Sequence, residues 1–276
     1  MYAADFTTPK VTFTPQLQQL INITLADKDY FPSITQNVAG KAIDLLVHSP
    51  GGFAEATESI VSHLRSQFDE IRVLVPGAAK SAATMLAMSA NVLVMDELSE
   101  LGPTDPQMVI NGRYSPAGAI LKQFETAERE LRADPAKIAA WMPVLQQYSP
   151  SILQECRNHL DLAQRLVADW LTMYMFAGEA DAREHAEAIA KWLASDENFL
   201  SHGRRIGIEE LQAQGLKIVD LRTDAVLREA IREVYLTLMH TFVGTGAYKL
   251  FENSEGASLA LSIVVQAISP QPPAPQ

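Results

Sequence analysis

Short apolar runs alternate with amphipathic segments between residues 43 and 107, and this alternation predicts a regular exchange of strands and helices. The apolar runs are residues 43–48 (IDLLVH), 71–75 (IRVLV) and 91–95 (NVLVM). Their length and branched side chains favour buried strands. Glycine turns follow the first two runs, at Ser49-Pro50-Gly51-Gly52 and at Pro76-Gly77. Helical patterns come next, over residues 54–68 and from residues 78–84 onward, whereas residues 98–107 look non-helical.

Strands that alternate with helices of this length predict a parallel sheet with crossover connections. The loops at the carboxyl ends of such strands are the expected place for a functional site. We therefore expect an α/β fold whose site is built from the two glycine turns and the stretch that follows the third strand.

The rest of the chain is mainly helical in pattern. Residues 11–24 favour a short strand and a helix. Further helices are predicted over residues 115–133, with Ser115 as cap and Pro116 at the first position, 134–147 with a kink at Pro143, 149–176, 181–194, 209–214 and 224–243. Residues 196–207 look like a loop, and residues 216–221 (LKIVDL) like a strand. We expect one domain over residues 1–265 and a disordered, proline-rich tail over residues 266–276.

Composition narrows the class of protein. The chain has 276 residues, a mass of 30.3 kDa, 47% hydrophobic residues and a net charge of −11. The acidic balance argues against a nucleic-acid partner, because phosphate binding requires a basic patch. The single cysteine, Cys156, excludes an internal disulfide. No apolar run is long enough to span a membrane and the N-terminus lacks a signal-peptide pattern, so a cytoplasmic location is expected.

Common cofactor and metal motifs are absent, whereas one serine stands in a reactive context. The sequence has neither GxGxxG nor GxxxxGK[ST], and its six histidines lack metal-ligand spacing, so we expect no cofactor and no metal. Ser81 follows a strand and a Pro-Gly turn and is surrounded by alanines. This layout would place its hydroxyl at the sheet edge with the N–H of Ala82 beside it. The ordinary alternative for Ser81 is a helix N-cap.

The order of these motifs resembles the ClpP-type peptidases and signal-peptide peptidase SppA, which share the Clp/crotonase fold. The string from Ser99 to Gln107 (SELGPTDPQ) and the later Ser201-His202-Gly203-Arg204 resemble a narrower branch, the serine dehydrogenase proteinase family. The resemblance covers about residues 40–255. It implies a spiral of ββα units with additional C-terminal helices, a peptide or protein substrate, and assembly into rings or stacks.

The same resemblance assigns roles to individual residues. Ser81 would be the nucleophile, Gly52 and Ala82 would supply the N–H groups of the oxyanion hole, and Asp105 and His202 would complete a Ser-Asp-His triad. Clp-type peptidases place their histidine near Thr104 or Asp105, where this sequence has none.

Chemistry alone leaves the general base open. A serine needs a base near neutral pKa and a group that orients it. His202 precedes a glycine in a loop and is equally well interpreted as a surface or capping histidine, and Asp105 equally well as a turn residue. His48 ends a strand and is more typical of a buried structural histidine. Lys80 would point away from Ser81 on a helix. SppA uses a Ser–Lys dyad, so the downstream lysines Lys122 and Lys137 are further alternatives, although a solvated helix face suits Lys137 better.

The leading hypothesis is a serine hydrolase, an ATP-independent peptidase that forms a homo-oligomer. The alternatives are a crotonase-like acyl-CoA enzyme and a non-catalytic binding or scaffold protein of the same fold. Oligomerisation is also predicted from apolar residues that surround two helices, at Met173 to Phe176 and at Val234 to Met239.

Overall fold

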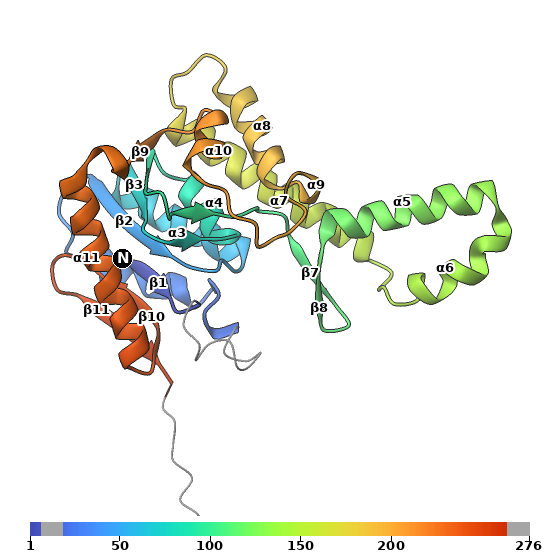
Figure 1. The fold of residues 1–276 in the computed structure, drawn as a ribbon, viewed down its shortest axis with the longest axis horizontal. Coiled ribbons are helices and arrows are strands. Elements are labelled where there is room, and N and C mark those ends of the chain that lie inside the picture. Colours follow the sequence, from blue (N-terminus) through green and yellow to red (C-terminus); the bar gives the residue numbers. More distant parts are fainter. Residues whose placement is uncertain (7–18, 264–276) are drawn as a thin grey trace, which may run out of the picture.

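The predicted alternation over residues 43–107 is present in the computed structural model, which describes residues 1–6 and 19–263. A seven-stranded sheet has the order β11-β10-β1-β2-β3-β5-β9 (Figure 1). Its strands are β1 (Tyr2–Ala4), β2 (Ala42–His48), β3 (Glu70–Val75), β5 (Val92–Met95), β9 (Ile218–Asp220), β10 (Ala247–Glu252) and β11 (Ser258–Ser262). The strands from β1 to β9 in this order pair in parallel, which confirms the expected parallel sheet. The antiparallel pair β10 and β11, which extends the sheet beyond β1, was not predicted.

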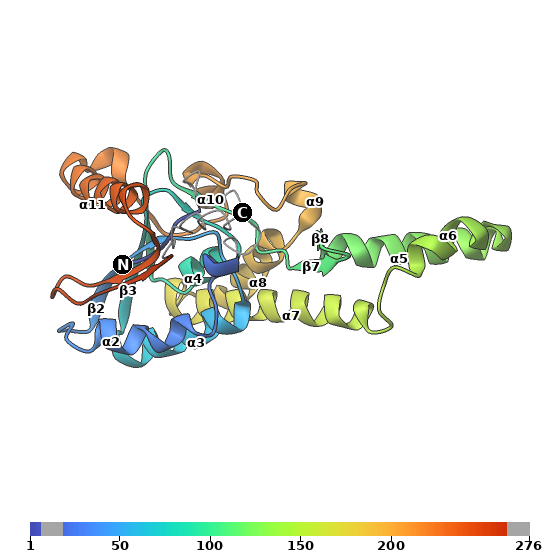
Figure 2. The same ribbon diagram turned by 90° about the horizontal axis from the view of Figure 1, so that it is seen from below.

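Helices cover both faces of the sheet, and successive residues of each strand face opposite cores. One core contains α2 (Phe31–Thr35), α3 (Ala54–Gln67), α4 (Ala82–Met88), α7 (Ile152–Trp170) and α8 (Ala182–Leu193). Leu45 and Val47 point into that core, whereas Leu46 points into the second core, beneath α11 (Ala225–Gly244). Figure 2 shows α11 on one side of the sheet and α3 and α7 on the other. The α/β fold class is confirmed.

A hairpin and two helices form an arm that projects away from the sheet (Figures 1 and 2). The arm contains β7 (Gln107–Ile110), β8 (Arg113–Pro116), α5 (Ala117–Ala133), the 3-10 helix Pro135–Lys137 and α6 (Ile138–Leu145). The predicted start of a helix at Ser115 is wrong, because Ser115 and Pro116 pair with Met108 and Gln107 across the hairpin. Pro143 lies inside α6, as expected.

The long helix predicted over residues 149–176 changes its winding near the end. α7 passes into a π-helix, Leu171–Met175, whose wider turn alters which side chains face the core. Met175 and Phe176 are each 1% exposed, whereas Met173 is 53% exposed. The inference that these consecutive apolar residues need a partner subunit is therefore wrong for Met175 and Phe176. On α11, Leu238 is buried, whereas Val234 and Leu236 are exposed.

The other helices and strands of the described residues are short. They are the 3-10 helices Asp27–Asp29 and Leu221–Thr223, the strands β4 (Ala78–Ala79) and β6 (Glu100–Leu101), and the helices α9 (Asp196–Phe199) and α10 (Ile208–Ala213). None of the helices in residues 1–6 and 19–263 is long and apolar enough to cross a membrane. The predicted tail at residues 266–276, and most of the strand and helix predicted over residues 11–24, lie outside the described residues.

Candidate active site

Ser81 occupies a strained turn between β4 and α4. The predicted helix does not open at Ala78, because Ala78 and Ala79 pair with β6, and α4 begins at Ala82. Ser81 has φ 51° and ψ −119°, a conformation that costs a non-glycine residue on the order of 1–3 kcal/mol. Its side chain makes no cap hydrogen bond, so the N-cap alternative does not describe its role. A serine held in such a turn resembles the strained strand-to-helix turn that exposes a nucleophile.

The first glycine turn packs directly against this serine. A methyl group on Gly51 would come within 2.7 Å of Ser81 Cβ and 2.9 Å of the Ala82 nitrogen. Gly51 has φ +100°, so both space and backbone conformation demand glycine there. The Gly51 N–H donates to Ser49 Oγ at 3.2 Å. Among the described residues, the N–H groups of Gly52 and Ala82 have no hydrogen-bond acceptor.

An isolated β-bridge with the buried residue Ile23 keeps Gly52 in place. The Ile23 N–H donates to the Gly51 carbonyl at 2.7 Å, and the Phe53 N–H donates to the Ile23 carbonyl at 2.9 Å. A methyl group on Gly52 would lie 2.3 Å from the Ile23 carbonyl oxygen. Gly52 is therefore a close-approach glycine, a contact that its own neighbours in the sequence do not reveal.

Asp105 lies at the end of a segment that is tied to the nucleophile's helix. Thr84 Oγ1 of α4 donates to the Gly102 carbonyl at 2.9 Å, and the Gly102 N–H donates back to Thr84 Oγ1 at 3.0 Å. The Asp105 side chain is 2% exposed. Its two carboxylate oxygens have different partners: Oδ1 contacts His202 Nδ1 at 2.8 Å, and Oδ2 accepts from Gln107 Nε2 at 2.5 Å.

His202 follows α9 in a loop that is held by hydrogen bonds to two other segments. The loop is antiparallel to β6, with Leu101 and Ile206 exchanging two backbone hydrogen bonds of 3.0 Å each. Arg205 Nη2 also donates to the Glu97 carbonyl at 2.6 Å. His202 remains 28% exposed. If Nδ1 donates its proton to Asp105, the other ring nitrogen, Nε2, carries the free lone pair and acts as the base.

Asp105 and His202, which are 97 residues apart in the sequence, thus form a direct contact. Ser81 is joined to the same region through Thr84 and the β4–β6 pairing. The Ser81 hydroxyl makes no hydrogen bond to another described residue, so its contact with His202 stays a prediction. Catalytic hydrogen bonds in unliganded enzymes are commonly long and tighten when substrate binds.

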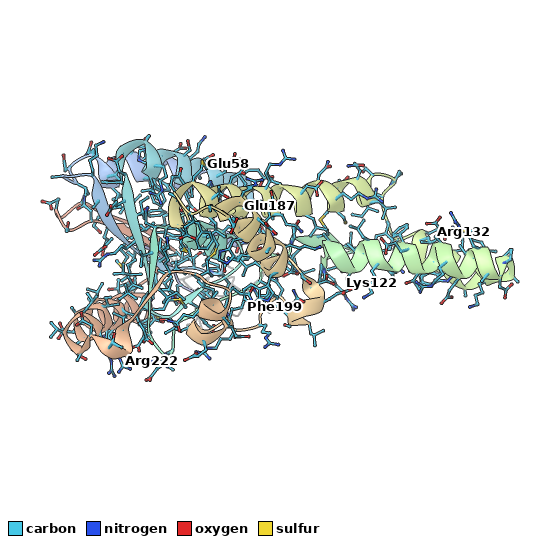
Figure 3. The ribbon with its side chains drawn as sticks, turned by 90° about the horizontal axis from the view of Figure 1, so that it is seen from above. Glu58, Lys122, Arg132, Glu187, Phe199 and Arg222 are labelled. Atoms are coloured by element: carbon cyan, nitrogen blue, oxygen red, sulfur yellow. The ribbon has the colours of Figure 1, made fainter. Side chains whose placement is uncertain are left out.

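The other proposed bases have different surroundings. Lys122 and Lys137 belong to the arm (Figure 3 labels Lys122). Lys122 pairs with Glu197 of α9, and Lys137 pairs with Glu130 of α5 at 3.3 Å. His48 is fully buried, and burial lowers its pKa to about 4. His48 is therefore a buried histidine at the end of a strand, as the sequence predicted.

Gln107 is the residue that sequence reasoning missed. Gln107 is the last residue of the string SELGPTDPQ, but the string does not indicate that its side-chain amide donates a hydrogen bond to the Asp105 carboxylate. The hairpin that begins at Gln107 was signalled by Asn111-Gly112, the dipeptide that favours a type I′ turn. Both residues have positive φ, 51° and 76°.

Comparison with known proteins gives matches over most of the chain. Residues 17–241 match the family described as ClpP-like SDH-type serine proteinase. The uncharacterized protein MJ0137 of Methanocaldococcus jannaschii is 37% identical over 197 residues, which are 71% of this chain and 60% of that protein. A second uncharacterized protein of the same organism, MJ1495, is 38% identical over 82 residues, 30% of this chain and 27% of its own length. The chain therefore spans less than two thirds of the length of these relatives.

Two solved structures are similar at lower identity. The membrane-bound stomatin-specific protease 1510-N has 18% identity and a TM-score of 0.42, over 72% of this chain and 74% of that one. ClpP1 from Listeria monocytogenes has 13% identity and a TM-score of 0.40, over 74% of this chain and 96% of that one.

Proposed function

Because the chain belongs to the ClpP-like SDH-type serine proteinase family, we propose that it is an ATP-independent serine peptidase in which Ser81, His202 and Asp105 form the catalytic triad. The observation that carries the proposal is the buried Asp105 carboxylate against His202 Nδ1 at 2.8 Å. A carboxylate in this position fixes the imidazole tautomer and stabilises the imidazolium that forms when the serine loses its proton.

The chemistry follows from these positions. Ser81 Oγ attacks the carbonyl carbon of a peptide bond while His202 Nε2 takes the hydroxyl proton. The resulting tetrahedral oxyanion accepts hydrogen bonds from the Gly52 and Ala82 N–H groups, and each such donor is worth roughly 10²–10³ in rate. The intermediate collapses, the C–N bond breaks, and the leaving amine takes the proton from His202. Water then hydrolyses the acyl-enzyme by the same base.

Three features support this assignment of groups. Ser81 is held in a strained conformation without a cap hydrogen bond. The Gly51 N–H is already used by Ser49, whereas the Gly52 N–H has no acceptor within residues 1–6 and 19–263. A crotonase-like acyl-CoA enzyme would give the Asp105–His202 pair no role.

A cytoplasmic location stays a prediction from the sequence alone.

The test uses an alkyl fluorophosphonate as an acylation mimic and intact-protein mass spectrometry as the assay. Ser81 Oγ bonds to phosphorus, the P–F bond breaks, and the serine proton passes to His202. Ser81→Ala should abolish labelling, and His202→Ala should slow it by about 10⁴-fold. Lys137→Ala, the matched test of a Ser–Lys mechanism, should label at the wild-type rate. A fast His202→Ala variant together with a slow Lys137→Ala variant would replace the triad with a Ser–Lys dyad.

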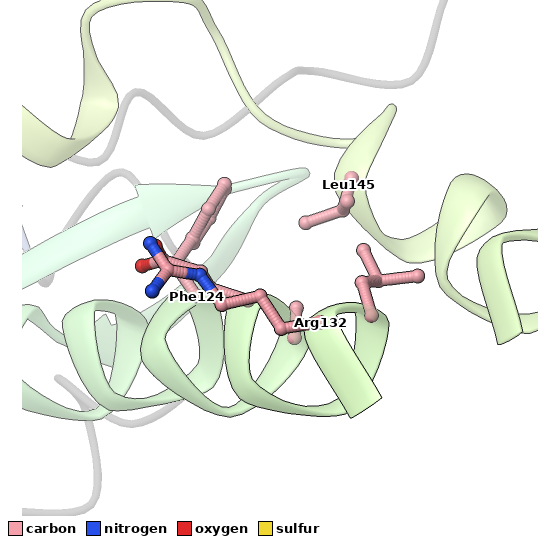
Figure 4. Close-up of a pocket in the computed structure, with 6 residues that line it drawn as sticks. Phe124, Arg132 and Leu145 are labelled. Carbon is pink, nitrogen blue, oxygen red and sulfur yellow. The ribbon is translucent and has the colours of Figure 1, made fainter. Parts of the chain in front are cut away.

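We further propose that the protein is a homo-oligomer and that the arm contributes to the interface. All eight residues of α6 are apolar (IAAWMPVL), and none of them is buried. Between α5 and α6 lies a largely apolar groove of about 420 Å³, lined by Phe124, Ala127, Glu128, Leu131, Arg132 and Leu145 (Figure 4). Members of the family are often oligomeric, and an apolar helix that leaves this much of its surface exposed suits burial against a second copy.

Light scattering at micromolar concentration tests this second part. The wild type should give a multiple of 30.3 kDa. Met142→Glu, on the exposed side of α6, should shift the mass toward the monomer. Lys191→Glu, a charge change at an exposed position of α8, is the control and should leave the mass unchanged. A wild-type protein of monomeric mass would refute the oligomer while leaving the catalytic proposal intact.

A further inference from the structure

Lys80, immediately before the proposed nucleophile, is not on a helix as the sequence suggested. It lies between β4 and α4, and its main chain joins two parts of the site. Its N–H donates to the Ser49 carbonyl at 2.9 Å, and its carbonyl accepts from the Ala83 N–H at 2.8 Å. The first bond leads to the glycine turn and the second to the start of α4.

The Lys80 side chain reaches two further segments. Its ammonium group donates to the Leu101 carbonyl at 3.1 Å and to the Arg204 carbonyl at 3.4 Å, and it pairs with Glu100 Oε1 at 3.0 Å. The side chain is only 13% exposed. Its stem crosses Gly102, where an added methyl group would lie 2.7 Å from Lys80 Cδ.

These contacts leave Lys80 no role as a base. A lysine ammonium has three N–H donors and no acceptor, and three oxygen atoms surround this one. The ammonium group is directed at Glu100, Leu101 and Arg204, and none of these contacts leads to the Ser81 hydroxyl. The contacts instead join the strand that leads to Ser81 to the loop that contains His202.

The connection falls close to the proposed base. Arg204 is two residues after His202, and its carbonyl is the acceptor of the Lys80 ammonium. Further along the loop, the Arg205 side chain contacts the Glu97 carbonyl, and Leu101 and Ile206 form their backbone pair. Lys80 therefore fixes the loop on the side nearer His202, where the backbone pairing does not extend.

We propose that Lys80 is a positioning residue for the general base, holding the His202 loop at its working distance from Ser81 through the Arg204 carbonyl. This inference rests on the proposed function, because it gives Lys80 a task only if His202 serves Ser81. A displacement of about 1 Å in a catalytic group costs about 100-fold in rate. Loss of the Lys80 contact should therefore slow acylation without removing the nucleophile.

The experiment compares fluorophosphonate labelling rates of folded variants, measured well below their unfolding temperatures. Lys80→Met keeps the apolar stem and removes the donors, and it should label 10- to 100-fold more slowly than the wild type. Lys80→Arg retains a charged donor and should recover part of the rate. Glu100→Gln weakens the ion pair while both carbonyl contacts stay, and it should lose a few-fold. Lys41→Met, at an exposed lysine whose ammonium group contacts the Gln67 carbonyl, is the matched control and should label at the wild-type rate.

Hydrogen–deuterium exchange separates positioning from general stability. In Lys80→Met, amides of residues 201–205 should exchange faster, whereas those of the sheet should be unchanged. Wild-type labelling rates in Lys80→Met, or slower labelling without faster exchange at residues 201–205, would overturn the inference. If Lys80→Met does not fold, Lys80→Arg and Glu100→Gln decide: wild-type rates and exchange in both refute it. Labelling that persists in Ser81→Ala would instead refute the proposed function itself.

Discussion

His48 should make the folded protein sensitive to mild acid. The imidazole is fully buried between the rings of Phe6 and Tyr235, with centroid distances of 4.7 and 5.2 Å. The Ala78 N–H approaches Nδ1 at 3.4 Å, and Nε2 has no hydrogen-bond partner among the described residues. Burial in this environment lowers the pKa of His48 from 6.5 to about 4. The folded protein therefore resists protonation that the unfolded chain accepts.

The sign and the size follow from proton linkage. Between pH 6.5 and pH 4 the unfolded chain binds the proton and the folded chain does not, so stability is complete above pH 6.5 and falls as pH decreases. Each pKa unit corresponds to about 1.4 kcal/mol, so the full loss is about 3 kcal/mol, of which about 2 kcal/mol appears between pH 7 and pH 5.

The assay is urea unfolding of the wild type and His48→Leu at a series of pH values and one protein concentration. Leucine cannot titrate, so the difference in unfolding free energy between the two proteins isolates His48 from the carboxylates that both share. Relative to His48→Leu, the wild type should lose about 2 kcal/mol between pH 7 and pH 5. His240→Gln, on the exposed side of α11, should follow the wild type. Parallel curves for the wild type and His48→Leu would show that His48 contributes nothing to the pH dependence of stability.

Two further predictions concern a buried ion pair of β10 and the residue that contacts Asp105. Lys249→Met should lower the free energy of unfolding, measured in urea, by about 3–5 kcal/mol. In the wild type the ammonium group lies 2.7 Å from the Asp27 carboxylate, which is 1% exposed, so the substitution leaves a buried charge without its partner. A loss below about 1 kcal/mol would contradict this prediction. Gln107→Ala should slow fluorophosphonate labelling by about tenfold, because Asp105 loses one charge-assisted hydrogen bond, and Ser81 should remain the labelled residue. An unchanged labelling rate would show that the Asp105 carboxylate needs no second hydrogen-bond partner.

The sequence predicted those parts of the fold that depend on local pattern. The strands and helices between residues 43 and 107 follow from runs of apolar residues broken by glycine turns, and their parallel pairing follows from the helices between them. β10 was missed because Lys249 interrupts its apolar pattern. That lysine is buried beside Asp27, 222 residues away in the sequence, which supplies its counter-charge.

The site divides in the same way. Ser81 and the glycine turn are recognisable because their local surroundings are unusual, and the structure places Gly51 against Ser81. The contact between Asp105 and His202 joins segments 97 residues apart, and only the family resemblance suggested it. The Lys80 contacts depend on three carbonyl and carboxylate oxygens from two other segments. No pattern within the chain specifies such a convergence.

Locating the fluorophosphonate label by digestion and peptide mass spectrometry tests the proposed triad directly. We expect one modified residue, Ser81, with the label absent from Ser81→Ala and strongly reduced in His202→Ala. A label on a different serine, or a folded protein that takes up no label while retaining peptidase activity, would contradict it.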